Sequence, residues 1–183
     1  MIMKKFYSRK GDEGYTGLLG KERVAKYHPK IEAIGATDEA SAALGMARSL
    51  TRSPETASVL LSIQQDLNLL MGEVAASQEN AEQFKAIGVE KVAWLEAQID
   101  HFAQSIEMPK EFILPGNTQA GAALAMARTI IRRAERRMAM LLHKGEIENP
   151  DLYRYLNRAS SLCFVLELYE YSISGAIKPE LAK

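Results

Sequence analysis

The chain has 183 residues, and its 23 Lys and Arg side chains balance 23 Asp and Glu side chains, so the formal net charge is zero. That balance argues against a general binder of nucleic acid or anionic membranes. The length suits a single domain whose core is stable without a disulfide or a structural metal ion. The single cysteine, Cys163, excludes an intramolecular disulfide and a multi-cysteine zinc site, and its apolar neighbours predict a buried thiol.

The first 28 residues have their own pattern. They lack the apolar stretch of a secretory signal, and no apolar run approaches the roughly 18–20 residues of a membrane span, so we expect a cytoplasmic protein. Glycine recurs at every third position from Gly11 to Gly20, between polar and basic residues. Such glycines let backbone N–H groups converge on an anion, although the same composition also fits a flexible, solvated tail. The segment is not a Walker A loop, because Lys21 is followed by Glu22.

The rest of the chain predicts helices. Prolines stand where helices should begin or end, and apolar residues recur at helical spacing between them. We expect five helices that begin near Pro29, Pro54, Gly88, Thr118 and Asn149 and end near Leu50, Val74, Ile106, His143 and Ser172. The predicted fold class is all-α, a five-helix antiparallel bundle over residues 29–175, with an N-terminal segment at 1–28 and a C-terminal tail at 176–183.

One carboxylate stands out on the first predicted helix. Asp38 shares a helix face with Ile31, Ile34, Ala42 and Gly45, so it should point toward the apolar side. A buried carboxylate is costly unless it is paired, and an arginine from elsewhere is the natural partner. The alternative is a helix phase that leaves Asp38 on the border of that face.

The fourth predicted helix is rich in arginine. Arg128, Arg132 and Glu135 fall within about 60° of one another at 100° per residue, and Arg136 lies beside them. Two arginines and a carboxylate on one stripe suit a phosphate chain with its metal, or an ion-pair network between subunits. A solvated charged face is the other interpretation, and it is the one we expect for Arg133 and Arg137, which point away.

Three further features accompany this stripe. Gly121 and Ala125 lie toward its N-terminal end and should leave room for a large ligand. The preceding segment, Phe112–Gly116, puts three large apolar residues in a connection, where they are either core fill or an exposed wedge. In the last helix, Asn157 is either a ligand contact or an interhelical hydrogen bond. No Ser/His/Asp arrangement is visible, and the three histidines are isolated.

In this order, these pieces resemble the PduO-type ATP:cob(I)alamin adenosyltransferases. The resemblance extends from about Tyr7 to Tyr169. It is carried by the segments 8–14 (SRKGDEG), 34–39 (IGATDE), 112–116 (FILPG), 127–136 (ARTIIRRAER) and 155–158 (YLNR).

The resemblance implies a homotrimer of five-helix bundles with active sites between the subunits. The implied reaction moves the 5′-deoxyadenosyl group of ATP to the cobalt of cob(I)alamin and releases triphosphate. Mg²⁺ is the implied metal, and a flavoprotein reductase and an adenosylcobalamin-dependent acceptor enzyme are the implied partners. The N-terminal segment would become ordered over the triphosphate on binding. Because the corrinoid supplies the nucleophile, the protein would need no catalytic base.

The resemblance also implies roles for particular residues. Phe112 would lie beneath the corrin and displace the lower axial ligand, with Ile113 and Leu114 as further corrinoid contacts. Phe112, Arg132 and Glu135 are the implied catalytic residues, and Glu135 would serve the metal. Arg128 would pair with Asp38 across the subunit boundary. The implied ATP contacts are Ser8, Arg9, Gly11, Asp12, Gly14, Thr16, Lys21, Lys26, Arg132, Glu135, Arg136 and Asn157.

Four positions depart from the family pattern: Ser8 replaces a common Thr, Glu13 a common Lys or Gln, Asn117 a glycine, and Ser161 a common Asp. Glu13 and Ser161 favour an alternative, a non-catalytic bundle that binds and delivers adenosylcobalamin or senses a nucleotide. A helical interaction protein whose arginine face binds RNA or a partner helix is a third hypothesis. The zero net charge and the lack of interleaved aromatic residues speak against it.

Overall fold

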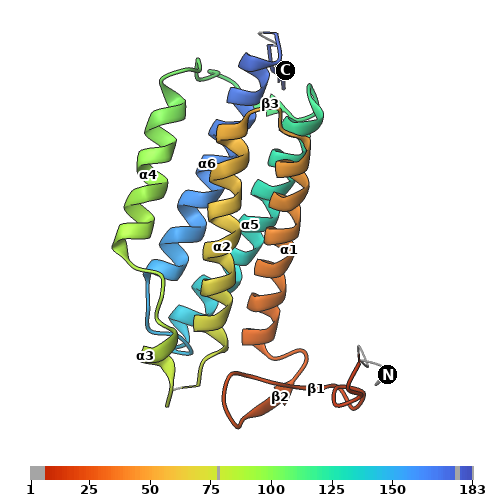
Figure 1. Ribbon diagram of the computed structural model, residues 1–183, viewed down its shortest axis with the longest axis vertical. Helices are drawn as coiled ribbons and strands as arrows, with labels where there is room; N and C mark the ends of the chain where they lie inside the picture. The colour runs from red at the N-terminus through yellow and green to blue at the C-terminus, as the bar shows by residue number, and fades with distance from the viewer. Residues whose placement is uncertain (1–6, 78, 176–177, 183) are drawn as a thin grey trace, which may run out of the picture.

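The computed structural model describes residues 7–77, 79–175 and 178–182. α1 packs antiparallel against α2 and α5, and α6 packs antiparallel against α5, whereas α4 runs in the same direction as α6, against which it packs (Figure 1). The predicted all-α, five-helix bundle is confirmed. The five long helices are α1 (Pro29–Leu50), α2 (Pro54–Ala75), α4 (Val89–Ala103), α5 (Gln119–His143) and α6 (Asp151–Ile173), and α3 (Ala81–Phe84) adds four residues. None of the helices in these described residues is both long and apolar enough to cross a bilayer.

Side-chain caps set the beginnings of two long helices. The Ser53 hydroxyl accepts a hydrogen bond from the Thr56 N–H at 3.1 Å, and the Thr118 hydroxyl accepts one from the Gly121 N–H at 2.9 Å. The predicted end of α4 near Ile106 is three residues too late. After Ala103 the backbone forms tighter turns, in which the Ile106 N–H donates a hydrogen bond to the Ala103 carbonyl, three residues earlier.

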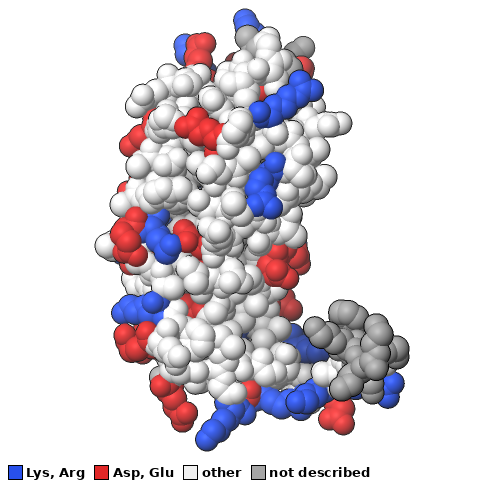
Figure 2. Space-filling view, in the orientation of Figure 1, with Lys and Arg blue, Asp and Glu red and all other residues white. Residues whose placement is uncertain are grey.

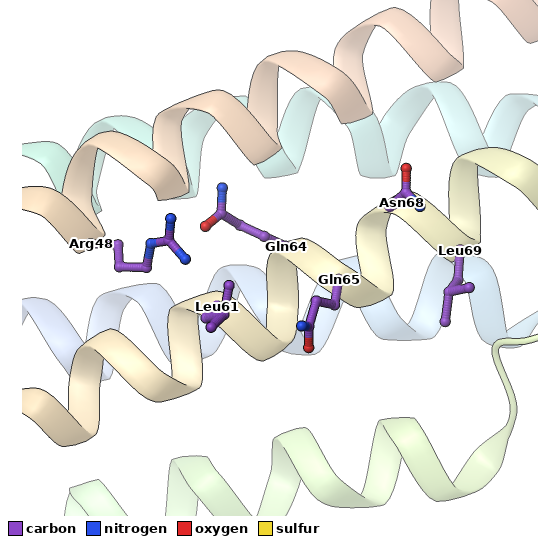
Figure 3. A pocket seen from close by; sticks show the side chains of 6 residues that line it. All are labelled: Arg48, Leu61, Gln64, Gln65, Asn68 and Leu69. Carbon is purple, nitrogen blue, oxygen red and sulfur yellow. The ribbon is translucent and has the colours of Figure 1, made fainter.

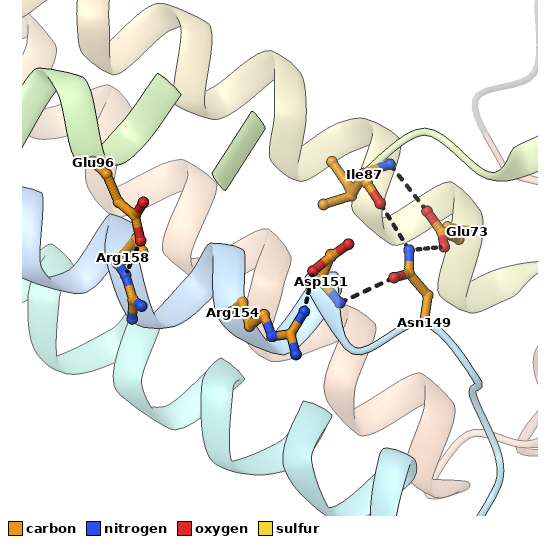
Figure 4. Close-up of polar contacts among 7 residues, drawn as sticks. All are labelled: Glu73, Ile87, Glu96, Asn149, Asp151, Arg154 and Arg158. Carbon is orange, nitrogen blue, oxygen red and sulfur yellow. Dashed lines mark hydrogen bonds and ion pairs between the residues drawn. The ribbon is translucent and has the colours of Figure 1, made fainter. Parts of the chain in front are cut away.

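Asn149 ties the start of α6 to the end of α2 (Figure 4). Its amide nitrogen donates to Glu73 Oε1 at 2.7 Å and to the Ile87 carbonyl at 2.8 Å. Its amide oxygen accepts from the Asp151 N–H at 2.9 Å, which satisfies one of the free donors of the first turn.

The phase of α1 differs from the expected one. Its buried side is formed by Ala33, Ala36, Ala40 and Leu44, and Asp38 is exposed. The expectation that Asp38 points into the core of its own chain is therefore wrong. The helix is alanine-rich, so small residues fill the side that faces α5, and the larger isoleucines are only half-buried.

The N-terminal segment forms a small antiparallel hairpin of β1 (Tyr15–Gly17) and β2 (Arg23–Ala25). It is anchored to the end of α2, because the Leu19 N–H bonds the Ala75 carbonyl and the Leu19 carbonyl accepts from the Ser77 N–H. The first six residues of the predicted segment lie outside the described residues. The ordering of this segment on binding stays a prediction.

The end of the chain adds a second small sheet. β3 (Ile113–Leu114) pairs antiparallel with β4 (Glu180–Leu181), and the Ala182 N–H donates to the Phe112 carbonyl at 2.8 Å. Residues 180–182 of the predicted tail therefore pair with the connection before α5. β3 lies at one end of the bundle and the β1–β2 hairpin at the other (Figure 1).

Candidate active site

The glycine-rich segment begins with a tight turn over residues 9–14. The Asp12 N–H donates to the Arg9 carbonyl at 3.3 Å, and the Gly14 N–H donates to the Gly11 carbonyl at 3.1 Å. Gly14 has φ +80°, a conformation that other residues rarely adopt, so this glycine is required by the turn itself. Of the other candidates here, Ser8 precedes the turn, Thr16 lies on β1, and Lys21 lies between the two strands.

Lys26 closes over this turn. Its backbone N–H donates to the Gly14 carbonyl at 2.9 Å, and its ammonium group lies 3.0 Å from the position that a Cβ on Gly11 would occupy. Arg23 adds a hydrogen bond to the Lys10 carbonyl at 2.5 Å. Lysine and arginine side chains are prominent at this end of the molecule (Figure 2), where an anion would find both charge and backbone donors.

A second group of candidates meets between α5 and α6. Glu135 is 8% exposed, and its carboxylate accepts a hydrogen bond from the Asn157 amide at 2.8 Å. Arg132 lies one turn before it, with 3.9 Å between the guanidinium and the carboxylate, and is itself half exposed. The structure thus brings together a mostly buried carboxylate and an accessible guanidinium, as the stripe on the helix predicts.

Asn157 is fixed from its other side by Arg158, a contact that the sequence reasoning missed. The Arg158 guanidinium donates to Asn157 Oδ1 at 2.6 Å. It also donates to Glu96 Oε1 at 2.7 Å (Figure 4). Both polar ends of the Asn157 amide are therefore used inside the chain. Arg158 lies in the motif at 155–158, but no sequence signal identifies Glu96, which comes from α4.

The remaining arginines of α5 point elsewhere. Arg133 pairs with Glu39, and Arg137 pairs with Glu32 at 3.6 Å, so these two join α5 to α1 at the surface. Arg136 is exposed. Surface pairs of this kind contribute little to stability, at most about 1 kcal/mol each.

Phe112 is 88% exposed, which rules out core fill within this chain. Its segment, together with Arg128 and Phe164, lines a cavity of about 410 Å³. Ile113 is half-buried, and Leu114 is exposed. A large ring held at the rim of a partly apolar cavity fits the wedge interpretation of this connection.

The space at Gly121 is taken by the protein itself. A Cβ there would lie 2.5 Å from the ring of Tyr171, and Ala125 is buried. The expectation that these small residues leave room for a ligand is wrong, because an aromatic ring from α6 fills the gap.

Arg128 has no acidic partner among the described residues within ion-pair distance, and its buried Nε lacks a hydrogen-bond acceptor there. Asp38 also lacks an ion pair within the described chain. Cys163 is buried as predicted, and burial raises the pKa of its thiol to about 12, against a lowering by Arg128. Burial likewise raises the pKa of the Glu167 carboxyl, against lowering by its hydrogen bond with Tyr171 and by Arg128.

The described residues contain no group of three or more His, Cys, Asp or Glu side chains that could enclose a metal ion. Glu135 offers one carboxylate. Magnesium in nucleotide sites is commonly held by one or two carboxylates together with substrate phosphates and water, so this single group is compatible with Mg²⁺.

The sequence profile of the cobalamin adenosyltransferase family matches residues 6–170. The chain belongs to this family. It is 36% identical to a corrinoid adenosyltransferase of Citrobacter freundii over 92% of this chain and 96% of that one, and 37% identical to that of Bacillus subtilis over 87% and 83%. It is 38% identical to the corrinoid adenosyltransferase PduO of Citrobacter freundii over 87% of this chain, but it spans about half the length of that relative.

Solved structures of the family agree closely with this fold. A phenylalanine-to-histidine variant of a PduO-type ATP:corrinoid adenosyltransferase from Lactobacillus reuteri, complexed with cobalamin and ATP, has a TM-score of 0.90 at 33% identity, covering 98% of this chain and 97% of that one. An arginine-to-lysine variant of such an enzyme from the same organism, complexed with ATP, has a TM-score of 0.88 at 32% identity, covering 97% and 100%.

Proposed function

We propose that this protein transfers the 5′-deoxyadenosyl group of ATP to the cobalt of cob(I)alamin. The Co(I) electron pair forms the bond to the ribose 5′-carbon, the bond from that carbon to oxygen breaks, and triphosphate leaves with the electrons. Family membership supports this proposal, as do the relatives named as corrinoid adenosyltransferases and the neighbour complexed with both cobalamin and ATP.

Phe112 is the observation that carries the proposal. Exposing a phenylalanine ring to water is unfavourable, and this ring is 88% exposed beside a cavity. Beneath a corrin, the ring would be buried and would exclude the lower axial ligand. Four-coordinate Co(II) is easier to reduce to the nucleophile, so the wedge would act before the transfer itself. Ile113 and Leu114 would extend the apolar contact.

The triphosphate needs groups that stabilise its growing charge as it departs. We assign this role to the 9–14 turn with Lys26, and to Arg132 with Glu135 and its metal. When bound, Mg²⁺ would offset charge on the phosphates. We expect ATP binding to hold these groups around the phosphates before the transfer, as catalysis by charge stabilisation requires. We assign nucleotide binding further to Ser8, Arg9, Asp12, Thr16, Lys21, Arg136 and Asn157.

We further propose that the working unit is a homotrimer with sites between subunits. The hairpin and the Phe112 segment lie at opposite ends of one bundle, so one copy does not combine them (Figure 1). A ring of three copies would bring unlike surfaces of neighbours together at each interface. Exposed apolar residues on α1 and α2 are available for such an interface, among them Met46, Leu61 and Leu69.

A groove on α2 supports the same proposal (Figure 3). Its volume is about 490 Å³, and its lining is Arg48, Leu61, Gln64, Gln65, Asn68 and Leu69. Gln64 Oε1 is buried there without a hydrogen-bond donor among the described residues. Asp38 on the adjoining helix and Arg128 are the charges we expect to pair across the interface. Such a pair would satisfy both groups, which is why we place it between copies rather than within one.

The remaining partners follow from the chemistry. Cob(I)alamin must be generated by a one-electron reductant, for which a flavoprotein reductase is suited, and the product must pass to an adenosylcobalamin-dependent acceptor enzyme. A reducing cytoplasm is the compartment that fits such a substrate.

The test is an anaerobic assay with chemically reduced cob(I)alamin and Mg-ATP. Adenosylcobalamin is followed by its visible spectrum and triphosphate by chromatography. Formation of both products in equal amounts is the expected result. A folded protein that binds ATP and corrinoid but forms neither product would overturn the proposal in favour of binding and delivery, and Glu13 and Ser161 would then be the residues to replace.

A further inference from the structure

The connection between β1 and β2 is docked on the chain that follows α2. The Leu19 N–H donates to the Ala75 carbonyl at 2.8 Å, and this carbonyl belongs to the last turn of α2, where such groups have no partner within the helix. The Leu19 carbonyl accepts from the Ser77 N–H at 3.2 Å. Within the described residues, every hydrogen bond from residues 7–25 to the chain beyond α1 involves Leu19. The hairpin therefore has one hydrogen-bonded docking point besides its covalent link to α1.

Asn80 adds a side-chain contact at the same point. Its amide nitrogen donates to the Leu19 carbonyl at 2.8 Å, and its amide oxygen accepts from the Ser77 hydroxyl at 3.0 Å. Asn80 is the N-cap residue of α3, where an asparagine side chain usually accepts from an N–H of the first turn. In α3, all of whose residues are described, the side chain makes no such cap bond. The Asn80 amide thus holds the hairpin and does not cap the helix.

Gly20 permits the close approach of the hairpin to this point. A Cβ on Gly20 would lie 3.0 Å from both Cβ and Oγ of Ser77, which is tighter than side chains ordinarily pack. The φ of Gly20 lies outside the left-handed region, so the close contact, and not the turn, requires glycine here. A Cβ on Gly17 of the same hairpin would meet nothing within 4 Å. The last glycine of the N-terminal series therefore serves docking.

The docked hairpin carries two of the proposed phosphate contacts. Lys21 follows Gly20 directly, and Lys26 lies just beyond β2 and closes over the 9–14 turn. β1 and β2 lie beyond the ends of the long helices (Figure 1). A two-stranded hairpin is at best marginally stable by itself. Its orientation is therefore fixed only when both ends are held, one by the chain that leads into α1 and the other by Leu19.

We propose that Asn80 is a positioning residue for the nucleotide: by holding the Leu19 carbonyl, it keeps Lys21 and Lys26 in the orientation that receives the triphosphate. The inference rests on the proposed binding of ATP by the N-terminal segment. Without this hydrogen bond, the hairpin is undocked in a larger share of molecules, and the apparent Kd for ATP rises as the competent share falls. Bound ATP itself holds the segment, so the maximal rate changes little.

Asn80→Ser is the first variant. Serine is neutral and caps a helix about as well as asparagine, but it is too short to reach the Leu19 carbonyl. Gln83→Ser is the matched control, because it removes an exposed amide side chain from α3 itself. Amide hydrogen exchange without ATP should accelerate about fivefold at Leu19 and Ser77 in Asn80→Ser and stay unchanged in Gln83→Ser.

The affinity for Mg-ATP tests the link to the nucleotide. Isothermal titration should give a Kd about fivefold higher in Asn80→Ser, the equivalent of about 1 kcal/mol for one hydrogen bond, and an unchanged Kd in Gln83→Ser. The kcat at saturating Mg-ATP and cob(I)alamin should stay within about twofold in both variants. A lower kcat with an unchanged Kd would contradict a role in positioning the hairpin for binding.

Gly20→Val disturbs the same contact from the hairpin side and removes no hydrogen-bonding group. It should accelerate exchange at Leu19 and raise the Kd for Mg-ATP in the same direction as Asn80→Ser. Gly17→Val is its control, because that position is open, and it should change neither quantity. Equal effects of the two glycine variants would show that contact with Ser77 is not what holds the hairpin.

Two results would overturn the positioning role. Unchanged exchange at Leu19 and Ser77 in Asn80→Ser would show that the Asn80 amide does not hold the hairpin. Faster exchange with an unchanged Kd would show that the docked hairpin does not receive the triphosphate. A protein that binds Mg-ATP but forms no adenosylcobalamin would instead refute the proposed transfer, and the exchange and affinity measurements would still decide the role of Asn80.

Discussion

The Asn157 amide donates a hydrogen bond to the mostly buried Glu135 carboxylate at 2.8 Å, and Arg158 in turn holds the amide oxygen at 2.6 Å. The carboxylate that we assign to the metal is thus oriented by a chain of contacts from α6. Oriented carboxylates matter in such sites, because partners of a ligand tune its position and basicity.

Asn157→Ala should raise the KM for Mg-ATP about tenfold, since a hydrogen bond to a charged group is removed and Glu135 is free to rotate. Steady-state kinetics with varied ATP at saturating cob(I)alamin measure this. Ser172→Ala, at an exposed position near the end of the same helix, is the control and should leave the KM unchanged. A normal KM in Asn157→Ala would remove Asn157 from the nucleotide site.

Phe112→Ala should spare ATP binding and the rate from cob(I)alamin, but slow adenosylation from cob(II)alamin at least about tenfold, because the lower axial ligand would return to the cobalt. Thermal unfolding should not change, since the ring makes few contacts within the chain. Val89→Ala, at an exposed position on α4, is the control for loss of an exposed apolar side chain. Equal slowing from both cobalt states would count against the wedge.

Gly11→Val should weaken ATP binding about tenfold, because a Cβ at this position would meet the Lys26 ammonium at 3.0 Å and push it off the turn. Isothermal titration with ATP provides the Kd. Gly17→Ala is matched to it, because a Cβ there has nothing within 4 Å. Equal affinities of the two variants would show that Lys26 does not bind the phosphates from this turn.

Asp38→Asn should weaken assembly, so that sedimentation velocity shows a shift toward smaller species at low micromolar protein. The uncompensated Arg128 charge in the interface is the physical reason. Glu39→Gln is the neighbouring control, because Glu39 pairs with Arg133 of its own chain, and it should leave the proposed assembly unchanged. Identical sedimentation of Asp38→Asn and the unmodified protein would reject the pair across the interface.

The Cys163 thiol, with its pKa raised to about 12, should favour the folded state below the unfolded thiol pKa of about 8.5 and lose that contribution as the pH rises toward 12. Chemical denaturation of Cys163→Ala and the unmodified protein between pH 7 and 10 tests the sign, since the stability difference between them should narrow as the pH rises. A difference that widens with pH would contradict the raised pKa.

Helix positions were predictable because caps and prolines act locally. Ser53 and Thr118 mark the beginnings of α2 and α5 wherever the helices then pack. The phase of α1 was not predictable, because alanines and isoleucines offer two apolar faces and only the partner helix decides between them. Gly121 shows the same limit, since a missing side chain cannot reveal whether a ligand or another ring fills the space.

No sequence pattern predicted the contacts between β3 and β4 or between Arg158 and Glu96, which join segments far apart in the chain. Two-residue strands such as β3 and β4 carry no periodic signal, and more than 60 residues separate them along the chain. Glu96 likewise looks like any surface glutamate until α4 is placed beside α6. The sequence predicted which residues form the candidate site, but not the hydrogen bonds and ion pairs that hold them in place.

The pairing of β4 with the Phe112 segment has a practical consequence for protein engineering. An affinity tag or fluorescent protein fused directly after β4 would begin within a few residues of the Phe112 ring. It would strain the hydrogen bond that the Ala182 N–H donates to the Phe112 carbonyl. Immobilising the protein through a linker placed after β4 would therefore put mechanical load on the segment that we propose for the corrinoid, whereas a dye attached at the exposed start of α4 would not.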